Sequence, residues 1–192
     1  MTILGTVIRL QVQRARLKPG PRGARGYDPA PLLQVQALDI GPRGVVGHTA
    51  EGRVLDVHHA DHSDSRNRGL RNGLSLLPQV HYDRLRQAYG PHLLDGLAGE
   101  SVLLDTAGPW NEADLEGPLE LETTDGWLAL TDVLAAPPCV EFSRFCLADP
   151  QADAGGEAVQ AALETLGHGL RGFYATTEGA GRVEVGCRLR RV

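Results

Sequence analysis

The sequence predicts a mainly β protein of the α+β type, in which a small barrel or sandwich carries a few inserted helices. Three observations support this class. Short segments of alternating apolar and polar residues recur along the chain. Few segments have helical periodicity, and strands and helices do not alternate as they do in a doubly wound sheet. With 192 residues the chain is long enough for one domain with a substantial core, and we predict a single domain over 1–192.

The first part of the chain is predicted to consist of strands and loops. Residues 8–13 alternate between apolar and polar side chains and, with the apolar Ile3 and Val7 before them, predict a strand. Residues 14–31 are rich in proline, glycine and arginine and predict a long, flexible loop. A second strand is expected over 32–40, and a short extended piece at 45–47 follows a turn. Residues 51–73 are largely polar.

The middle of the chain is predicted to combine strands with one helix. The apolar run 74–78 predicts a buried strand. A helix is expected to begin at Pro78 and to end before Gly90, because proline favours the first helical position and glycine the end. Residues 99–106 follow as another strand.

The last third is predicted to contain a hairpin, a helix and two closing strands. Asp125-Gly126 lies between two strand-like runs and is a hairpin signal. Residues 155–169 have an apolar face at helical spacing and are ended by glycines. Two strands joined by a turn at 178–181 complete the chain.

Composition narrows the classes of function and location. The net charge of −5 gives no overall attraction to nucleic acid or to anionic membranes. No apolar run approaches the length of about 20 residues that crosses a bilayer, and the first residues lack the pattern of a signal peptide. The three cysteines are an odd number, which favours reduced thiols. We expect a cytoplasmic protein that binds neither nucleic acid nor membranes.

Cys139 is the first candidate for chemistry. It follows two prolines, which stiffen the chain, and it would lie near the start of a helix, where the helix dipole favours the thiolate. The alternative is a small apolar core residue, which is how free cysteines usually behave and which the local pattern favours. Cys146 and Cys187 are expected to be core residues.

The polar segment 56–73 is the second candidate. His58 and His62 are four residues apart, which would suit a divalent metal if the segment were helical. Arg66, Arg68 and Arg71 alternate with small polar residues and form a candidate cradle for a phosphate or carboxylate. A solvated loop explains the same pattern equally well.

Four motifs occur in a suggestive order along the chain. They are "GTVIRLQVQ" at 5–13, "GLAGESVLLD" at 96–105, "PPCVEF" at 137–142 and "RGFYATTEGAGRVEVG" at 171–186. In this order the chain resembles the MOSC domain, the module named for the C-terminal part of molybdenum cofactor sulfurases. The resemblance extends from about Leu4 to Leu189.

The resemblance implies a β-barrel fold and a role in handling molybdenum cofactor (molybdopterin) or sulfur. It implies that Cys139 carries sulfur or binds molybdenum, both of which suit a soft thiolate. The candidates for holding the cofactor are Arg66, Arg68, Arg71, Arg171 and Tyr174. A cysteine desulfurase or a reductase is the implied partner, and reductive detoxification of N-hydroxylated compounds is the implied activity.

Two other classes of function stay open. The family's His-Gly-Gly element is absent, its "GEN" is Gly99-Glu100-Ser101 here, and its final "GD" is Gly186-Cys187. These departures favour a non-catalytic binding module that kept the barrel and lost the cofactor. A third hypothesis is a metal-dependent hydrolase built on His58, His62 and Asp64.

Overall fold

A computed structural model describes residues 1–21, 23–65, 67 and 69–192. The first half of the chain supplies the following elements: β1 (Thr2–Gln13), β2 (Leu32–Gln34), β3 (Ala37–Gly41), β4 (Gly44–Thr49), β5 (Gly52–Leu55), β6 (Leu74–Pro78) and α1 (Gln79–Tyr89). The second half supplies these: β7 (Val102–Thr106), the 3-10 helix η1 (Glu112–Leu115), β8 (Leu119–Thr123), β9 (Gly126–Ala135), α2 (Val140–Cys146), α3 (Glu157–Leu166), β10 (Phe173–Thr176), β11 (Gly181–Glu184) and β12 (Arg188–Arg191).

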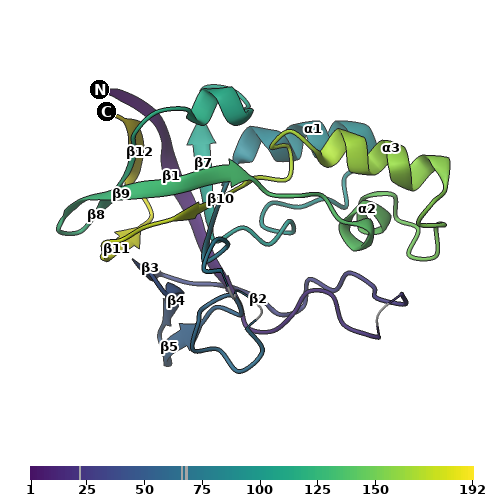
Figure 1. The fold of residues 1–192 in the computed structure, drawn as a ribbon, viewed down its shortest axis with the longest axis horizontal. Helices are drawn as coiled ribbons and strands as arrows, with labels where there is room; N and C mark the ends of the chain where they lie inside the picture. Colours follow the sequence, from purple (N-terminus) through teal and green to yellow (C-terminus); the bar gives the residue numbers. More distant parts are fainter. Residues whose placement is uncertain (22, 66, 68) are drawn as a thin grey trace.

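Within the described part of the chain, seven strands form a closed barrel. Their order is β12-β8-β9-β10-β6-β7-β1, and pairing of β12 with β1 closes the ring. Figure 1 shows β1 and β12 side by side where the ring closes. The predicted mainly β barrel with a few helices is therefore confirmed.

A smaller sheet lies against the barrel. It has the order β11-β3-β4-β5, and it lies below the barrel in the view of Figure 1. The single strand predicted over 32–40 is wrong in one respect, because β2 pairs with β1 whereas β3 joins the smaller sheet. The break between them lets the chain pass from one sheet to the other. Residues 52–55, predicted to lie in a polar segment, are the edge strand of the smaller sheet.

The end of the chain also crosses between the two sheets. Two closing strands were predicted, and the structure has three, since the turn at 185–187 separates β11 from β12. β11 pairs with β3 in the smaller sheet, whereas β12 pairs with β8 and β1 in the barrel. Val185 is exposed at this turn.

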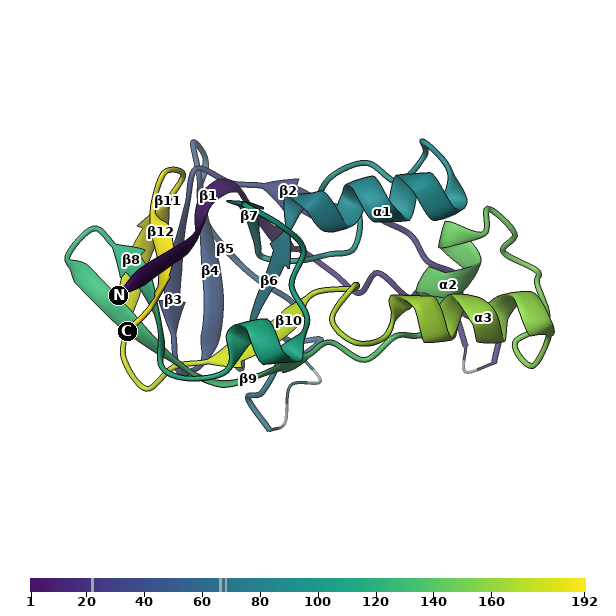
Figure 2. The same cartoon turned by 90° about the horizontal axis from the view of Figure 1, so that it is seen from above.

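Helices α1, α2 and α3 gather at one end of the barrel (Figure 2), where α1 packs against the outer side of β6 and β7. On β6, Leu74 and Leu76 face the barrel interior while Leu77 belongs to a second cluster with the helices. Leu103 of β7 also joins this second cluster. Strands buried on both faces need consecutive apolar residues, which explains the runs that the sequence shows here.

The predicted helix after β6 is confirmed as α1. Tyr82 and Leu85 are fully buried in the second cluster, as their spacing predicts. Pro78 is the last residue of β6 and lies just before the helix rather than in its first turn. None of the helices in the described ranges is long and apolar enough to span a membrane.

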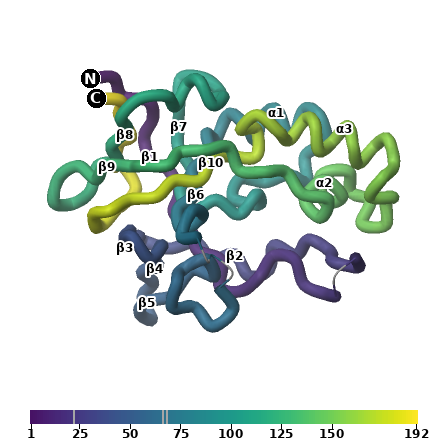
Figure 3. The backbone as a smooth tube through the Cα atoms, in the orientation of Figure 1, coloured from purple at the N-terminus to yellow at the C-terminus, as the bar shows by residue number. Residues whose placement is uncertain are grey.

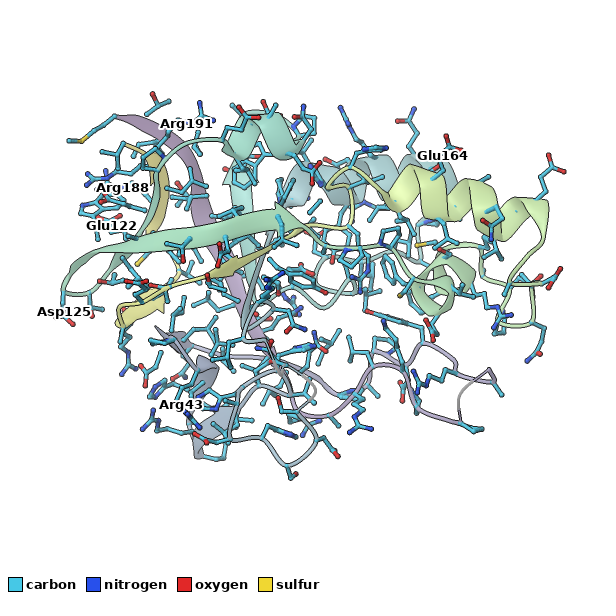
Figure 4. All side chains as sticks on the ribbon, in the orientation of Figure 1. Arg43, Glu122, Asp125, Glu164, Arg188 and Arg191 are labelled. Atoms are coloured by element: carbon cyan, nitrogen blue, oxygen red, sulfur yellow. The ribbon has the colours of Figure 1, made fainter. Side chains whose placement is uncertain are left out.

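Ion pairs connect neighbouring barrel strands on the side of the barrel away from α1, α2 and α3. Arg188 donates hydrogen bonds of 2.8 Å to both carboxylate oxygens of Glu122, and Figure 4 shows the two side chains together near β12. Two residues further along β12, Arg190 donates a hydrogen bond to the Glu120 carboxylate. Its guanidinium carbon lies 3.7 Å from the centroid of the Trp127 ring. These pairs join β12 to β8, next to the seam where the ring closes.

Candidate functional site

A cavity of about 210 Å³ lies between the loop after β1, the loop after β5, and strands β6 and β10. This is about seven times the volume that one water molecule occupies in the liquid, enough for a small ligand or part of a larger one. The cationic residues on its wall are Arg16, Lys18, Arg25 and Arg171. The acidic or titratable ones are His58, Asp64, Glu100, Tyr27 and Tyr174. The excess of basic side chains suits an anionic ligand.

The loop over 14–31 forms one side of this cavity and reaches toward α2 (Figure 3). Tyr27 fixes it there. The Tyr27 hydroxyl donates a 2.7 Å hydrogen bond to the carbonyl of Leu97, and its ring contacts Phe142 and Phe145 at centroid distances of 5.0 and 5.1 Å. The predicted absence of regular strands or helices holds for the described part of this loop, and its flexibility stays a prediction.

The motif at 171–174 brings two distant segments together. Gly172 has a φ of +102° and lies against β6, so that a Cβ there would stand 2.8 Å from the carbonyl oxygen of Leu76. The Gly172 carbonyl accepts a 2.8 Å hydrogen bond from the amide of Ala136. The segment that leads to Cys139 is thereby held beside Arg171.

Replacing Gly172 by alanine is expected to lower the free energy of unfolding by about 2 kcal/mol, since it combines an unfavourable φ with a contact to fixed backbone. The matched control is Gly186→Ala. Gly186 has a φ of +97° but open space around it, so only the backbone strain of about 1 kcal/mol applies. Equal losses in urea denaturation would contradict the role given to the Leu76 contact.

Arg171 is the central basic residue of the site. Its guanidinium lies over the Phe142 ring at 5.4 Å and approaches the carbonyl of Pro137 at 3.5 Å. Its Nε is buried and has no hydrogen-bond partner among the described residues. Burial alone would lower the pKa of Arg171, but the charges of Cys139 and Tyr174 outweigh it and raise this pKa above its usual range. Arg171 is therefore cationic.

Cys139 is the residue immediately before α2, and it is half-buried. Its carbonyl accepts hydrogen bonds of 3.0 Å from both the amide and the hydroxyl of Ser143, which fixes the start of the helix. Cys139 is not on the cavity wall itself. Ala136 and Arg171, which are on the wall, connect it to the cavity. The structure thus brings together Cys139, Arg171 and Tyr174 from the predicted set.

Of the predicted arginine cradle, only Arg71 lies within the described residues, and it does not join this group. Arg71 is exposed and is not part of the cavity wall. Arg66 and Arg68 lie outside the described residues. Basic residues of the loop after β1, which were not among the predicted site residues, line the cavity instead. The signal was available, because residues 14–25 contain four arginines and the only lysine of the chain.

The predicted histidine pair lies in a segment of turns rather than a helix. His58 Nδ1 is 2.9 Å from Asp56 Oδ1, and only His58 of the pair lines the cavity. His62 binds instead to the carbonyl of Arg14 and to the amide of Asp64. In the residues that the structure describes, no three His, Cys, Asp or Glu side chains gather in a way that could hold a metal ion.

The other two cysteines have structural surroundings. Cys146 is fully buried in the second cluster, as predicted, and burial raises the pKa of its thiol to about 12. Cys187 is half-buried and packs against the barrel core, where its Sγ accepts a 3.4 Å hydrogen bond from the amide of Glu184. Cys139 is therefore the one of the three cysteines that stands beside the cavity.

Glu100 is a buried acid that the sequence analysis named only as part of a motif. It is 4% exposed, and the Tyr82 hydroxyl donates a 2.8 Å hydrogen bond to its Oε2. Its Oε1 has no partner in the part of the chain that the structure describes. Burial raises the pKa of Glu100 to about 7, and the hydrogen bond from Tyr82 only partly opposes this. The signal in the sequence was a lone carboxylate within an apolar stretch.

Comparisons with known proteins place this geometry in a known fold. No protein-family model and no curated protein matches the sequence. Among solved structures, YuaD from Bacillus subtilis matches with a TM-score of 0.59 and 13% identity, covering 97% of this chain and 94% of that chain. YiiM from Geobacillus stearothermophilus matches with a TM-score of 0.54 and 18% identity, covering 98% and 75%. YiiM from Escherichia coli matches with a TM-score of 0.51 and 14% identity, covering 83% of this chain and 64% of that chain.

The chain has a MOSC-like fold. At these identities the likeness establishes the fold and nothing of the chemistry. The MOSC-like chain nevertheless places the motif around Cys139 and the motif around Arg171 next to each other, although 32 residues separate them in sequence.

Proposed function

We propose that this MOSC-like protein carries sulfur on Cys139 as a persulfide. The observation that carries the proposal is the position of this half-buried thiol beside the Arg171 guanidinium, at the side of a cavity with further cationic side chains. A thiol that accepts sulfur must react as the thiolate, and the Arg171 guanidinium beside Cys139 is a fixed cation that can bind the anionic sulfur.

The transfer step balances with a persulfide donor. The Cys139 thiolate attacks the terminal sulfur of a donor persulfide, a new S–S bond forms on Cys139, and the donor thiolate leaves with the electron pair of the broken S–S bond. Arg171 stabilises the anion before and after the step. A cysteine desulfurase, which holds a persulfide on its own cysteine, is the class of partner that this chemistry needs.

A second candidate is binding of molybdenum cofactor, and the basic cavity is the observation that favours it. The donor set fits such a group, since Arg16, Lys18, Arg25 and Arg171 would hold its anionic part and Cys139 is a soft ligand. When bound, the group would supply redox chemistry of the kind that reduces N-hydroxylated compounds. At about 210 Å³ the cavity is below the range of about 300–1,000 Å³ typical of whole-ligand pockets. It suits the anionic part of the cofactor.

The persulfide is tested with purified protein, a cysteine desulfurase and free cysteine, using intact-mass and peptide mass spectrometry. We expect a mass increase of one sulfur on the peptide that contains Cys139, and its loss in Cys139→Ser. The matched control is Cys187→Ser, which removes a half-buried thiol from the barrel and should leave the signal unchanged. A persulfide that persists in Cys139→Ser would overturn the proposal.

Cofactor binding is tested separately, by expression in a host that makes molybdenum cofactor, followed by measurement of bound molybdenum and pterin. Molybdenum that is present in wild type and lost in Cys139→Ser supports the second candidate. A chain that takes up neither sulfur nor cofactor would instead be a binding module that kept only the barrel. The metal-hydrolase hypothesis gains no support from the described residues, because His58 and His62 do not meet around a shared position.

A further inference from the structure

The buried carboxylate of Asp56 is fully engaged in hydrogen bonds. Asp56 is 2% exposed and lies at the end of β5. Its Oδ2 accepts a 2.7 Å hydrogen bond from the amide of Gln13, and its Oδ1 accepts one of 2.8 Å from the amide of His58. The ring of His58 makes a third contact, with Nδ1 at 2.9 Å from Oδ1. These bonds fix the carboxylate, and the carboxylate in turn orients the imidazole.

This contact determines what the other ring nitrogen offers. An ionised carboxylate only accepts hydrogen bonds, so Nδ1 must carry the hydrogen. In the neutral ring Nε2 is then an acceptor. The His58 side chain is 27% exposed and lines the cavity, and Nε2 makes no hydrogen bond with the residues that the structure describes. His58 Nε2 is therefore an oriented neutral acceptor on the wall of a cavity that also carries several cationic donors.

An acceptor among cations distinguishes between anions. We propose that Asp56 and His58 make this cavity selective for an oxyanion that still carries a proton, such as hydrogen phosphate or a singly protonated phosphate monoester. Arg171 and the basic residues of the loop after β1 would bind the charged oxygens, and His58 Nε2 would accept the remaining O–H. A fully ionised oxyanion would instead place a lone pair against the lone pair of Nε2. The inference rests on the basic cavity of the proposed function but not on Cys139.

The other charged groups around His58 are part of the site. On its own loop these are Asp56 and Asp64. From the neighbouring elements they are Arg16 and Lys18 of the loop after β1, Glu100 before β7, and Arg171 and Tyr174 at β10. Arg16 is already bound to Asp64, with 3.0 Å to the carbonyl and 3.5 Å to Oδ1, so part of its charge is balanced.

Inorganic phosphate and sulfate are the probes. At pH 8 both are mainly dianions of similar shape, but hydrogen phosphate carries one O–H and sulfate carries none. We expect calorimetric titration to show phosphate binding at least about tenfold more tightly than sulfate, which corresponds to one hydrogen bond of about 1.4 kcal/mol. His58→Phe should remove the preference at pH 8, whereas His92→Phe, outside the cavity wall, should retain it.

Equal affinities for the two anions in the wild type at pH 8 would overturn the inference. Failure to bind either anion would overturn it together with the cofactor candidate, while a persulfide on Cys139 would still stand. If His58→Phe does not fold, ¹⁵N spectra of the wild-type imidazoles decide the matter. A His58 ring with its hydrogen on Nδ1 supports the inference, and one with its hydrogen on Nε2 contradicts it.

Discussion

Replacing Phe142 by alanine is expected to lower the free energy of unfolding by about 3–5 kcal/mol, the usual cost of truncating a fully buried aromatic side chain. Phe142 is 0% exposed, and its ring contacts Tyr27 of the loop after β1 and lies beneath the Arg171 guanidinium. Urea denaturation measures the loss. We also expect weaker phosphate binding, because the variant frees both the loop and the guanidinium that form the cavity.

The control for this prediction is the neighbouring Phe145→Ala. Phe145 is only half-buried, although it too contacts Tyr27, and its truncation should cost about 1–2 kcal/mol. Equal losses for the two variants would show that α2 is not anchored through Phe142.

Replacing Glu100 by glutamine is expected to change how stability depends on pH. The pKa of Glu100 is raised from 4.5 to about 7 by burial, so between these values the folded protein holds a proton that the unfolded chain has released. The free energy of unfolding therefore falls as pH rises from about 4.5 to about 7 and is constant above. For a shift of this size the fall is about 3 kcal/mol.

Glutamine does not titrate, so the variant should gain about 3 kcal/mol relative to wild type between pH 4 and pH 8. His81, whose pKa burial lowers to about 4, titrates in both proteins and cancels in the comparison. The control is Glu164→Gln on the outer side of α3 (Figure 4), which should follow the wild-type profile. Parallel profiles for wild type and Glu100→Gln would contradict the prediction.

The local sequence pattern predicts most of the strands and helices, but it does not predict which strands pair with one another. Alternation identifies β1, and the apolar run with Pro78 and Gly90 identifies β6 and α1. The passage of the chain between two sheets at 35–36 and at 185–187 has no such signal, because an extended segment looks the same whichever neighbour it pairs with. The periodicity of a strand predicts which residues share a face, but it does not predict which strand it pairs with.

The site shows the same limit. Cys139, Arg171 and Tyr174 came from a resemblance over the whole chain, and their local sequences alone favour nothing more than core and surface positions. Glu100 and Tyr27 were missed because their roles depend on neighbours that are distant in sequence, Tyr82 in one case and Phe142 in the other. Arginines in a loop are equally common on a solvated surface, so composition alone cannot identify residues 16–25 as part of the cavity wall.

The seam between β1 and β12 affects how the barrel can be made. Thr2 pairs with Arg191, and β12 also pairs with β8, so the last strand fills the gap between two others. Until β12 is in place, β1 and β8 each present an open edge that can pair with another chain. Contacts this far apart in sequence are associated with slow folding, because the entropy of closing long loops is lost before the contacts form. During synthesis the barrel therefore stays open until the final strand has emerged, and that interval is when the chain is most exposed to aggregation.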